Sequence, residues 1–401
     1  MISELSNVIQ PYAWGSRRAL AELRGEPAPT AAPEAELWMG AHPLAPSRLS
    51  ATGQTLDEAV AAAPRELLGR AVAESYGSQL PFLLKVLAAA TPLSLQAHPS
   101  IPQAQAGFAA DEAAGIALDA PHRNYRDRNH KPELLCALGE FWALCGFREV
   151  AQTLALLDEL SLPELTPIRQ ALAQDGSSAG ISRVFARLMT APAAERSALA
   201  RAAAGACQAK AGSSPRFASE LGWGARIGAL YPGDVGVVVA LLLNLVRLAP
   251  GQAIYLPAGN LHAYLEGAGV EIMASSDNVL RGGLTPKHVN VQELLKVLDF
   301  SPLHVEPLNA VKVGAEHVYR TAAREFQLSY FDVAEAAVTV TVTVSGPEIW
   351  LVTAGRVELR SADLSRVELG AGKSAFVSAA AGDLQLSGSG RIFRSRVAHP
   401  G

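Results

Sequence analysis

Residues 251–262, with the sequence GQAIYLPAGNLH, contain the most informative pattern for the architecture of this chain. A short β-forming run leads into a Pro/Gly turn, and a histidine opens the next apolar run. A turn of this kind between two strands directs the first inward side chain, here His262, into the mouth of a small β-barrel, where a metal ion can bind. A histidine after such a turn is also found as an ordinary turn residue without a metal. The prediction that His262 binds a metal therefore needs support from elsewhere in the chain.

A second candidate segment is residues 94–99, SLQAHP. Gln96 and His98 are two residues apart, so on a strand both side chains project from the same face. His98 is a natural partner for His262 at a metal ion. A neutral amide oxygen is a poor zinc ligand by itself, so a simple hydrogen-bonding role for Gln96 remains an equal alternative.

The third segment is residues 125–133, YRDRNHKPE. A charged run of this kind is usually a solvated loop, but this one leads directly into the apolar strand LLCAL, which draws its end toward the core. Glu133 would complete a mixed coordination sphere of two imidazoles, one carboxylate and one amide oxygen. Such a set suits a borderline divalent ion, with zinc as the first choice.

The fourth segment, residues 271–287, has the sequence EIMASSDNVLRGGLTPK. Two cations, Arg281 and Lys287, occur here with hydroxyl groups and a pair of glycines, a combination that favours phosphate binding. The pattern is neither G-x-G-x-x-G nor a Walker A loop, so it does not imply a nucleotide.

Composition restricts the class of protein. The chain has 401 residues, of which 49% are hydrophobic, and a formal net charge of −4. It can therefore bury large cores, and it has no basic surplus for nucleic acid or an anionic membrane. The three cysteines lack C-x-x-C spacing and are expected to be reduced, as in the cytoplasm. The apolar run 235–246 is too short to span a membrane and is interpreted as a buried strand or core helix. No signal peptide is recognised.

Changes in periodicity predict the domain organisation. Residues 1–147 and 230–300 show short, often β-branched runs bounded by turns, as expected of one β domain. Residues 148–229 have helical periodicity and are predicted to form an all-α insertion. Residues 301–401 are expected to form a second β unit with little ionisable chemistry. The predicted fold class is mainly β with an α insertion, with a jelly roll or barrel as the β architecture.

These segments resemble the type I mannose-6-phosphate isomerases, also called phosphomannose isomerases. Residues 125–133 match that family's first signature, and residues 262–287 match its second except that Gly282 replaces an alanine. Residues 251–262 also fit the second cupin motif, G(x5)PxG(x2)H. PYAWGS near residue 11, ELWMGAHP near 36 and LPFLLKVL near 80 are similar to N-terminal segments of the family. The resemblance spans roughly residues 8 to 300.

The resemblance implies a metal-bearing cupin jelly roll, a helical insertion and a second, metal-free cupin jelly roll. It implies one zinc ion per chain, and the corresponding ligands are Gln96, His98, Glu133 and His262. Arg281 corresponds to the family's active-site arginine. The positions of candidate substrate or phosphate contacts are Lys85, Ser94 and Lys287.

The implied reaction interconverts mannose 6-phosphate and fructose 6-phosphate through a cis-enediol. The general base is left open between Glu271 and Lys131, with His130 as a third candidate, and Glu271 is alternatively a partner that orients His262. Two rivals are a non-enzymatic cupin that senses sugar phosphates and an iron-dependent cupin oxygenase. A cytoplasmic monomer acting on a small sugar phosphate, without nucleic acid or membrane partners, is expected.

Overall fold

The strand after the Pro/Gly turn, β11 (His262–Ala274), organises the part of the molecule that contains the predicted site. The computed structural model describes residues 1–334, 340–362 and 364–398. The first half of β11 pairs with β6 and β8, and its second half pairs with β5 and β7. A register shift between Tyr264 and Glu266 separates the two halves, so that one long strand serves two sets of neighbours.

We call the strands connected through β11 the site sheet. Its other members are β2 (Val8–Gln10), β3 (Glu36–Met39), β5 (Phe82–Ala89), β6 (Leu95–Ala97), β7 (Glu133–Ala137), β8 (Phe141–Phe147), β9 (Leu243–Leu248), β10 (Ala253–Leu256) and β12 (Leu280–Gly283). The pairings are antiparallel, as the short, turn-bounded runs of the sequence predict.

The second group of strands forms the C-terminal sheet. Its members are β1 (Ile2–Ser6), β4 (Arg48–Leu49), β13 (Val311–Val313), β14 (Glu316–Val318), β15 (Gln327–Val333), β16 (Val340–Val342), β17 (Glu348–Ser361), β18 (Arg366–Gly370), β19 (Ser374–Val377) and β20 (Leu384–Arg396). The chain's first strand lies here, because β1 pairs with β19, with Ile2 opposite Val377. The two ends of the sequence therefore share a sheet.

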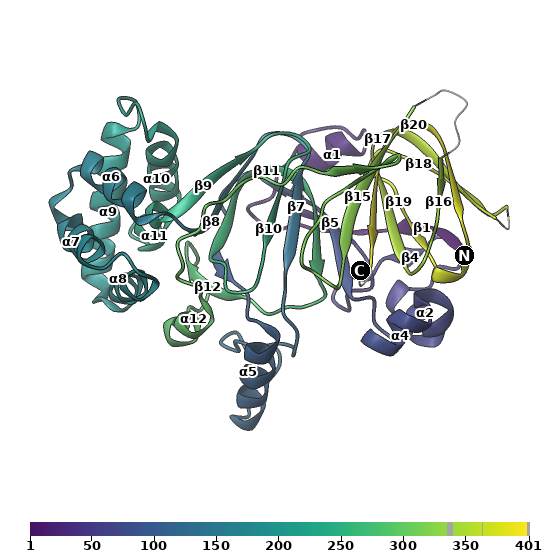
Figure 1. Cartoon of the computed structure of the whole chain (residues 1–401), viewed down its shortest axis with the longest axis horizontal. Helices are drawn as coiled ribbons and strands as arrows, with labels where there is room; N and C mark the ends of the chain where they lie inside the picture. Colours follow the sequence, from purple (N-terminus) through teal and green to yellow (C-terminus); the bar gives the residue numbers. More distant parts are fainter. Residues whose placement is uncertain (335–339, 363, 399–401) are drawn as a thin grey trace.

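A cluster of helices lies at one end of the molecule, beyond β8 and β9 (Figure 1). It consists of α6 (Val150–Leu160), α7 (Thr166–Gln174), α8 (Ser178–Thr190), α9 (Ala193–Lys210), α10 (Ala218–Leu230) and α11 (Gly236–Leu242). The helical periodicity of the sequence is confirmed for α6, α8 and α9. The apolar run 235–246 contains both expected structures, because α11 ends at Leu242 and β9 begins at the next residue.

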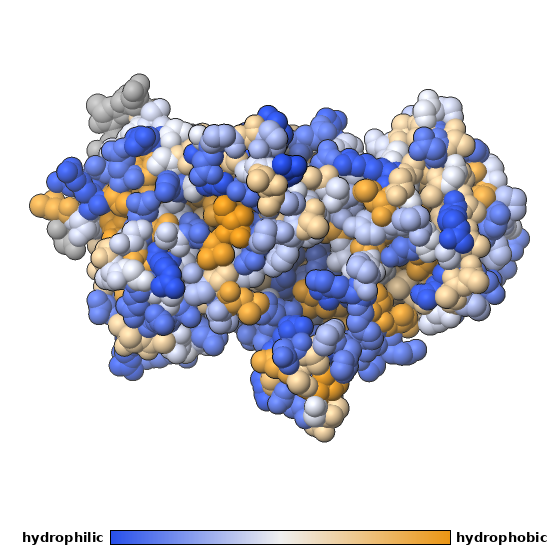
Figure 2. Space-filling view, turned by 180° about the vertical axis from the view of Figure 1, so that it is seen from behind, coloured by the Kyte–Doolittle hydropathy of each residue, from blue (hydrophilic) through white to orange (hydrophobic). Residues whose placement is uncertain are grey.

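The remaining helices are short connections around the sheets. They are α1 (Ala19–Leu23), α2 (Leu56–Ala62), α3 (Pro64–Leu68), α4 (Arg70–Tyr76), α5 (Ile101–Ala113) and α12 (Val291–Val297), with 3-10 turns at Pro163–Leu165 and Ala379–Ala381. None of the helices within the described ranges is long and apolar enough to cross a membrane. On the face shown in Figure 2, apolar residues form small groups among hydrophilic ones.

Alternation along the strands gives the site sheet two different faces. On β7, Leu134 and Cys136 join a core shared with the C-terminal sheet, including Leu328 of β15. Leu135 and Ala137 join a separate apolar cluster on the opposite face. Glu133 lies two residues before Leu135, so its side chain points to the same face as that of Leu135. This places its carboxylate on the side away from the C-terminal sheet.

Candidate metal centre and anion site

The turn predicted from residues 251–262 brings two ligand-bearing segments together. Gly259 has a φ of +81°, which favours glycine, and a Cβ added there would lie 3.1 Å from the carbonyl oxygen of Val297. The Gly259 N–H donates to the carbonyl of His98 at 2.8 Å. In addition, β6 and β11 pair with His262 opposite Gln96. The turn therefore fixes the backbone of both histidines.

Three predicted ligands converge in the interior. The ligand atoms of His98, Glu133 and His262 all lie within 4.8 Å of one another, and all three residues are buried. Nε2 of His98 lies 3.4 Å from Oε1 of Glu133, and Nε2 of His262 lies 3.4 Å from Oε2. Two ligand atoms around one tetrahedral ion at about 2.1 Å would be separated by about 3.4 Å. The spacing therefore fits a zinc-type site.

The hydrogen bonds of the two histidines also fit a metal. Nδ1 of His98 lies 2.7 Å from the carbonyl of Asn278, and Nδ1 of His262 lies 3.0 Å from the carbonyl of Asn260. A carbonyl only accepts, so each Nδ1 carries the proton and each Nε2 presents a lone pair. Both Nε2 atoms and Oε2 of Glu133 are buried without a hydrogen-bond partner among the described residues. A metal ion would satisfy all three atoms.

Charges in the site favour the forms that bind a cation. Burial lowers the pKa of His98 to about 4 despite the opposing charge of Glu133, so its imidazole is neutral near pH 7. Burial alone would raise the pKa of Glu133, but the positive charge of Lys131 is the largest of the effects that outweigh burial, and the pKa is held well below its usual range. Lys131 lies close, with its Nζ 3.1 Å from Oε1 of Glu133.

A second buried cluster of charges lies beside the metal group. Nζ of Lys85 is 3.4 Å from Glu36 and 3.5 Å from Glu271, and it also lies over the ring of Trp38. Burial would lower the pKa of Lys85, but the two carboxylates raise it above its usual value. Burial, only partly offset by Lys85, raises the pKa of Glu271 to about 7. Lys85, predicted as a substrate contact, thus lies in an internal ion-pair cluster.

Three cations gather on β12 and the neighbouring loops. The backbone of Arg281 lies opposite that of Gln96 where β12 pairs with β6. Burial and the proximity of Arg126 lower the pKa of Arg281, and burial together with Arg281 and Arg126 lowers that of Lys287. Cations that repel one another in this way form a ready site for a multivalent anion. Ser94, half-buried, directly precedes the segment of β6 that pairs with β12.

Asn278 connects the cations to the metal group. Its side-chain oxygen accepts from the backbone N–H of Arg126 at 2.7 Å, and its amide group donates to the carbonyls of Asp127 and Asn129. Its own carbonyl accepts from His98. Arg126, Asn278 and Glu36 were not predicted as site residues, although all three lie within the quoted motifs. Their residue type alone did not indicate a functional role, because exposed arginines and loop asparagines are common.

His130, the third candidate base, is directed toward the C-terminal sheet. Its Nε2 lies 2.8 Å from Oε1 of Glu325, in the connection between β14 and β15. Gly282, where the related signature has alanine, does not have a positive φ, and an added Cβ would lie 3.2 Å from Cδ1 of Leu261, a tight contact.

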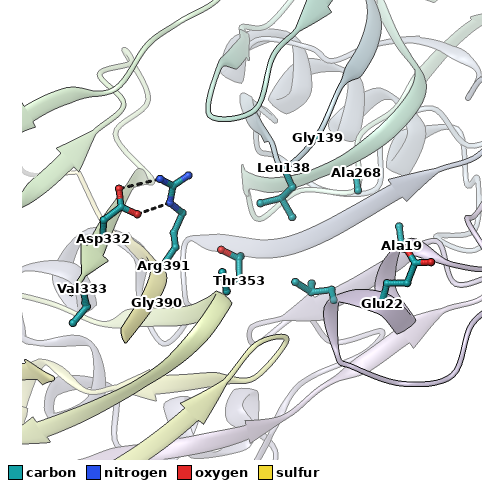
Figure 3. A pocket seen from close by; sticks show the side chains of 12 residues that line it. Ala19, Glu22, Leu138, Gly139, Ala268, Asp332, Val333, Thr353, Gly390 and Arg391 are labelled. Atoms are coloured by element: carbon teal, nitrogen blue, oxygen red, sulfur yellow. Dashed lines mark hydrogen bonds and ion pairs between the residues drawn. The ribbon is translucent and has the colours of Figure 1, made fainter. Parts of the chain in front are cut away.

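A cavity of about 650 Å³ lies elsewhere, between the site sheet and the C-terminal sheet (Figure 3). Leu138 lies on one side of it, and the ion pair of Asp332 and Arg391 lies on the other. None of the predicted site residues lines this cavity. The three free cysteines are buried, as expected for reduced core thiols.

Comparisons with known proteins point to one family. The family model "Phosphomannose isomerase type I, catalytic domain" matches residues 2–150. Mannose-6-phosphate isomerase of Salmonella typhimurium is 41% identical over 98% of this chain and 99% of its own, and the enzyme of Escherichia coli is 38% identical over the same shares. The human enzyme is 35% identical over 74% of this chain and 73% of its own.

Solved structures are similar along the whole chain. A zinc-bound crystal structure of mannose 6-phosphate isomerase superimposes with a TM-score of 0.90 at 38% identity, covering 99% of this chain and 100% of that one. A structure of mannose 6-phosphate isomerase bound with zinc and yttrium gives the same values. Family signatures, sequence identity over nearly the full length and the shared fold together show that this chain belongs to the mannose-6-phosphate isomerase family.

Proposed function

We propose that this chain interconverts mannose 6-phosphate and fructose 6-phosphate as a zinc-dependent aldose–ketose isomerase. The observation that carries the proposal is the group of three buried ligand atoms on His98, Glu133 and His262, which have no hydrogen-bond partner in the described part of the chain. Gln96 is proposed as the fourth ligand, and its position opposite His262 across β6 and β11 supports this role.

The reaction must move a proton from C2 to C1 of the open-chain sugar through a cis-enediol. Bound zinc supplies Lewis-acid stabilisation of the negative charge that develops on oxygen. His98, Glu133 and His262 hold that ion. Arg281 provides positive charge beside the substrate and is too basic to serve as the base.

Glu271 is proposed as the group that accepts the C2 proton. A pKa of about 7 places its carboxyl where both protonation states are populated near neutral pH, which is the condition for efficient proton transfer. Lys131 is the competing candidate, but its Nζ ion-pairs with Glu133 and must leave that partner to act as a base. Lys131 is instead assigned to stabilising charge next to the metal group, and Lys85 to keeping Glu271 in place.

The phosphate group is proposed to bind between Arg281, Lys287 and Arg126, with Ser94 as a neighbouring hydroxyl donor. Guanidinium and ammonium groups suit a dianion. Burial, and after it repulsion among the cations, lowers the pKa values of Arg281 and Lys287, and a bound phosphate would relieve the repulsion.

We expect Arg126→Ala to raise the KM for mannose 6-phosphate about tenfold while leaving kcat within about twofold, since the phosphate is bound equally in ground state and transition state. Steady-state kinetics measure this split. Arg128→Ala is the matched control, because Arg128 lies in the same loop but over the ring of Phe108. Equal KM values for the wild type and Arg126→Ala would remove Arg126 from the anion site.

The surrounding architecture is proposed to consist of two cupin-type jelly rolls and a helical domain. The catalytic unit comprises residues 1–147 and 230–300, the helical insertion residues 148–229, and the metal-free unit residues 301–401. The pairing of β1 with β19 adds the first residues to the C-terminal sheet. A cytoplasmic monomer remains the expectation. The net charge of −4 supports the absence of nucleic-acid and anionic-membrane partners. A non-enzymatic sensor is not favoured, because the curated relatives are isomerases.

The function is tested by a coupled assay for fructose 6-phosphate formed from mannose 6-phosphate. We expect activity that disappears after chelation and returns when zinc is added to the metal-free protein. Activity that persists in fully metal-depleted protein would contradict the zinc requirement, and inactivity of folded, zinc-loaded protein would contradict the isomerase assignment.

A further inference from the structure

The C-terminal part of the chain contacts the strand that carries Glu133. The side chains of Leu134 and Cys136, which face away from that of Glu133 on β7, pack against the segment between β14 and β15. In that segment Tyr319 and Phe326 are almost fully buried. Sγ of Cys136 lies 3.0 Å from the hydroxyl of Tyr319, which donates to the carbonyl of Gly251 at 2.6 Å. The segment thus touches both β7 and the start of the turn that leads to His262.

From the same segment, Glu325 reaches the loop before β7. Oε1 of Glu325 lies 2.8 Å from Nε2 of His130, and both side chains are mostly buried. Burial would raise the pKa of Glu325, but the hydrogen bond and charge of His130 and backbone donors lower it. Glu325 is therefore a carboxylate that accepts a hydrogen bond from the Nε2–H of His130.

His130 and Lys131 lie between two other anchoring points. Asn278 holds the backbone from Arg126 to Asn129. On the other side, the N–H of Ala274 donates to the carbonyl of Pro132 at 3.1 Å. Between these points, His130 is directed outward to Glu325, while the next side chain, Lys131, is directed inward to Glu133.

From this arrangement we propose that Glu325 is a positioning residue. Acting through His130, it holds the segment 130–131 so that Lys131 stays in contact with Glu133. This inference rests on the proposed function for its kinetic consequence, but the tether itself is a structural claim. It gives the C-terminal unit a role in the active site, although none of its side chains belongs to the metal group.

The test compares Glu325→Ala, Glu325→Gln and the matched control Glu368→Ala in the zinc-loaded full chain. Glu368 pairs with Arg356 at the exposed end of the C-terminal sheet, far along the chain from the site loops.

We expect Glu325→Ala to lower kcat about tenfold with KM within about twofold, as a small misplacement of a reacting group does. Glu325→Gln should recover most of the loss, because its amide oxygen accepts the same hydrogen bond. Adding His130→Ala to Glu325→Ala should cost little more, because both act through one contact.

Hydrogen–deuterium exchange provides a readout that does not depend on activity. Glu325→Ala should speed exchange in residues 126–134 and leave the helices α6–α10 unchanged, whereas Glu368→Ala should leave 126–134 as in the wild type. Unchanged exchange in 126–134, or faster exchange throughout the chain, would overturn the proposal. An inactive wild type would contradict the proposed function alone, and the exchange result would still decide whether the tether exists.

Discussion

Replacing His262 by alanine should reduce zinc from about one ion per chain to a small fraction and lower kcat/KM about 10³-fold or more. The magnitude follows because Lewis-acid stabilisation of the developing charge is worth several kcal/mol, and each 1.4 kcal/mol is a factor of ten. His262 contributes one of three buried ligand atoms and also begins β11. Metal analysis after gel filtration and steady-state kinetics on the same sample measure both effects.

The control for this variant is His304→Ala, which removes an exposed histidine that lies 3.5 Å from Glu306. It should keep both zinc and activity. Circular dichroism of His262→Ala separates loss of metal from loss of fold. If folded His262→Ala retained stoichiometric zinc and wild-type turnover, the group formed by His98, Glu133 and His262 would not be the metal centre.

Glu271→Gln should lower kcat by about 10²- to 10⁴-fold, the usual contribution of a general base. The sign of the pH effect follows from the raised pKa. A carboxyl with a pKa of about 7 is largely protonated below that pH, so the active carboxylate increases as pH rises. The kcat/KM of the wild type should therefore rise with pH to a plateau. The midpoint should lie at or below about 7, because a bound cation favours the carboxylate. The variant should lack this rise.

Solvent deuterium incorporation during single turnovers identifies the base directly. Glu271→Gln should abolish exchange at the transferred proton, whereas Glu266→Gln should not. Glu266 is on the same strand but is partly exposed and paired with Arg226. If Lys131→Met abolished deuterium incorporation and Glu271→Gln did not, the assignment of the base would be wrong and Lys131 would take that role.

The ligand-bearing turn was predictable because its signal is local. The Pro/Gly turn and His262 lie within twelve residues, and the spacing of Gln96 and His98 follows from strand geometry alone. The helices α6, α8 and α9 were predictable for the same reason, since their apolar periodicity is contained within each segment. The division of the run 235–246 into α11 and β9 was not, because a continuous apolar run is equally compatible with a buried strand and a buried helix.

The type of each proposed ligand and the segment that carries it can be read from the amino-acid sequence. Which groups lose contact with water, and which ones meet across the chain, is visible only in the folded structure. His98 meets Asn278 across 180 positions, and His130 meets Glu325 across 195. Glu271 acquires a pKa of about 7 because folding buries its carboxyl group, an effect that the neighbouring Lys85 offsets only in part. Burial and long-range pairing depend on how the sheets pack, and no local pattern encodes them.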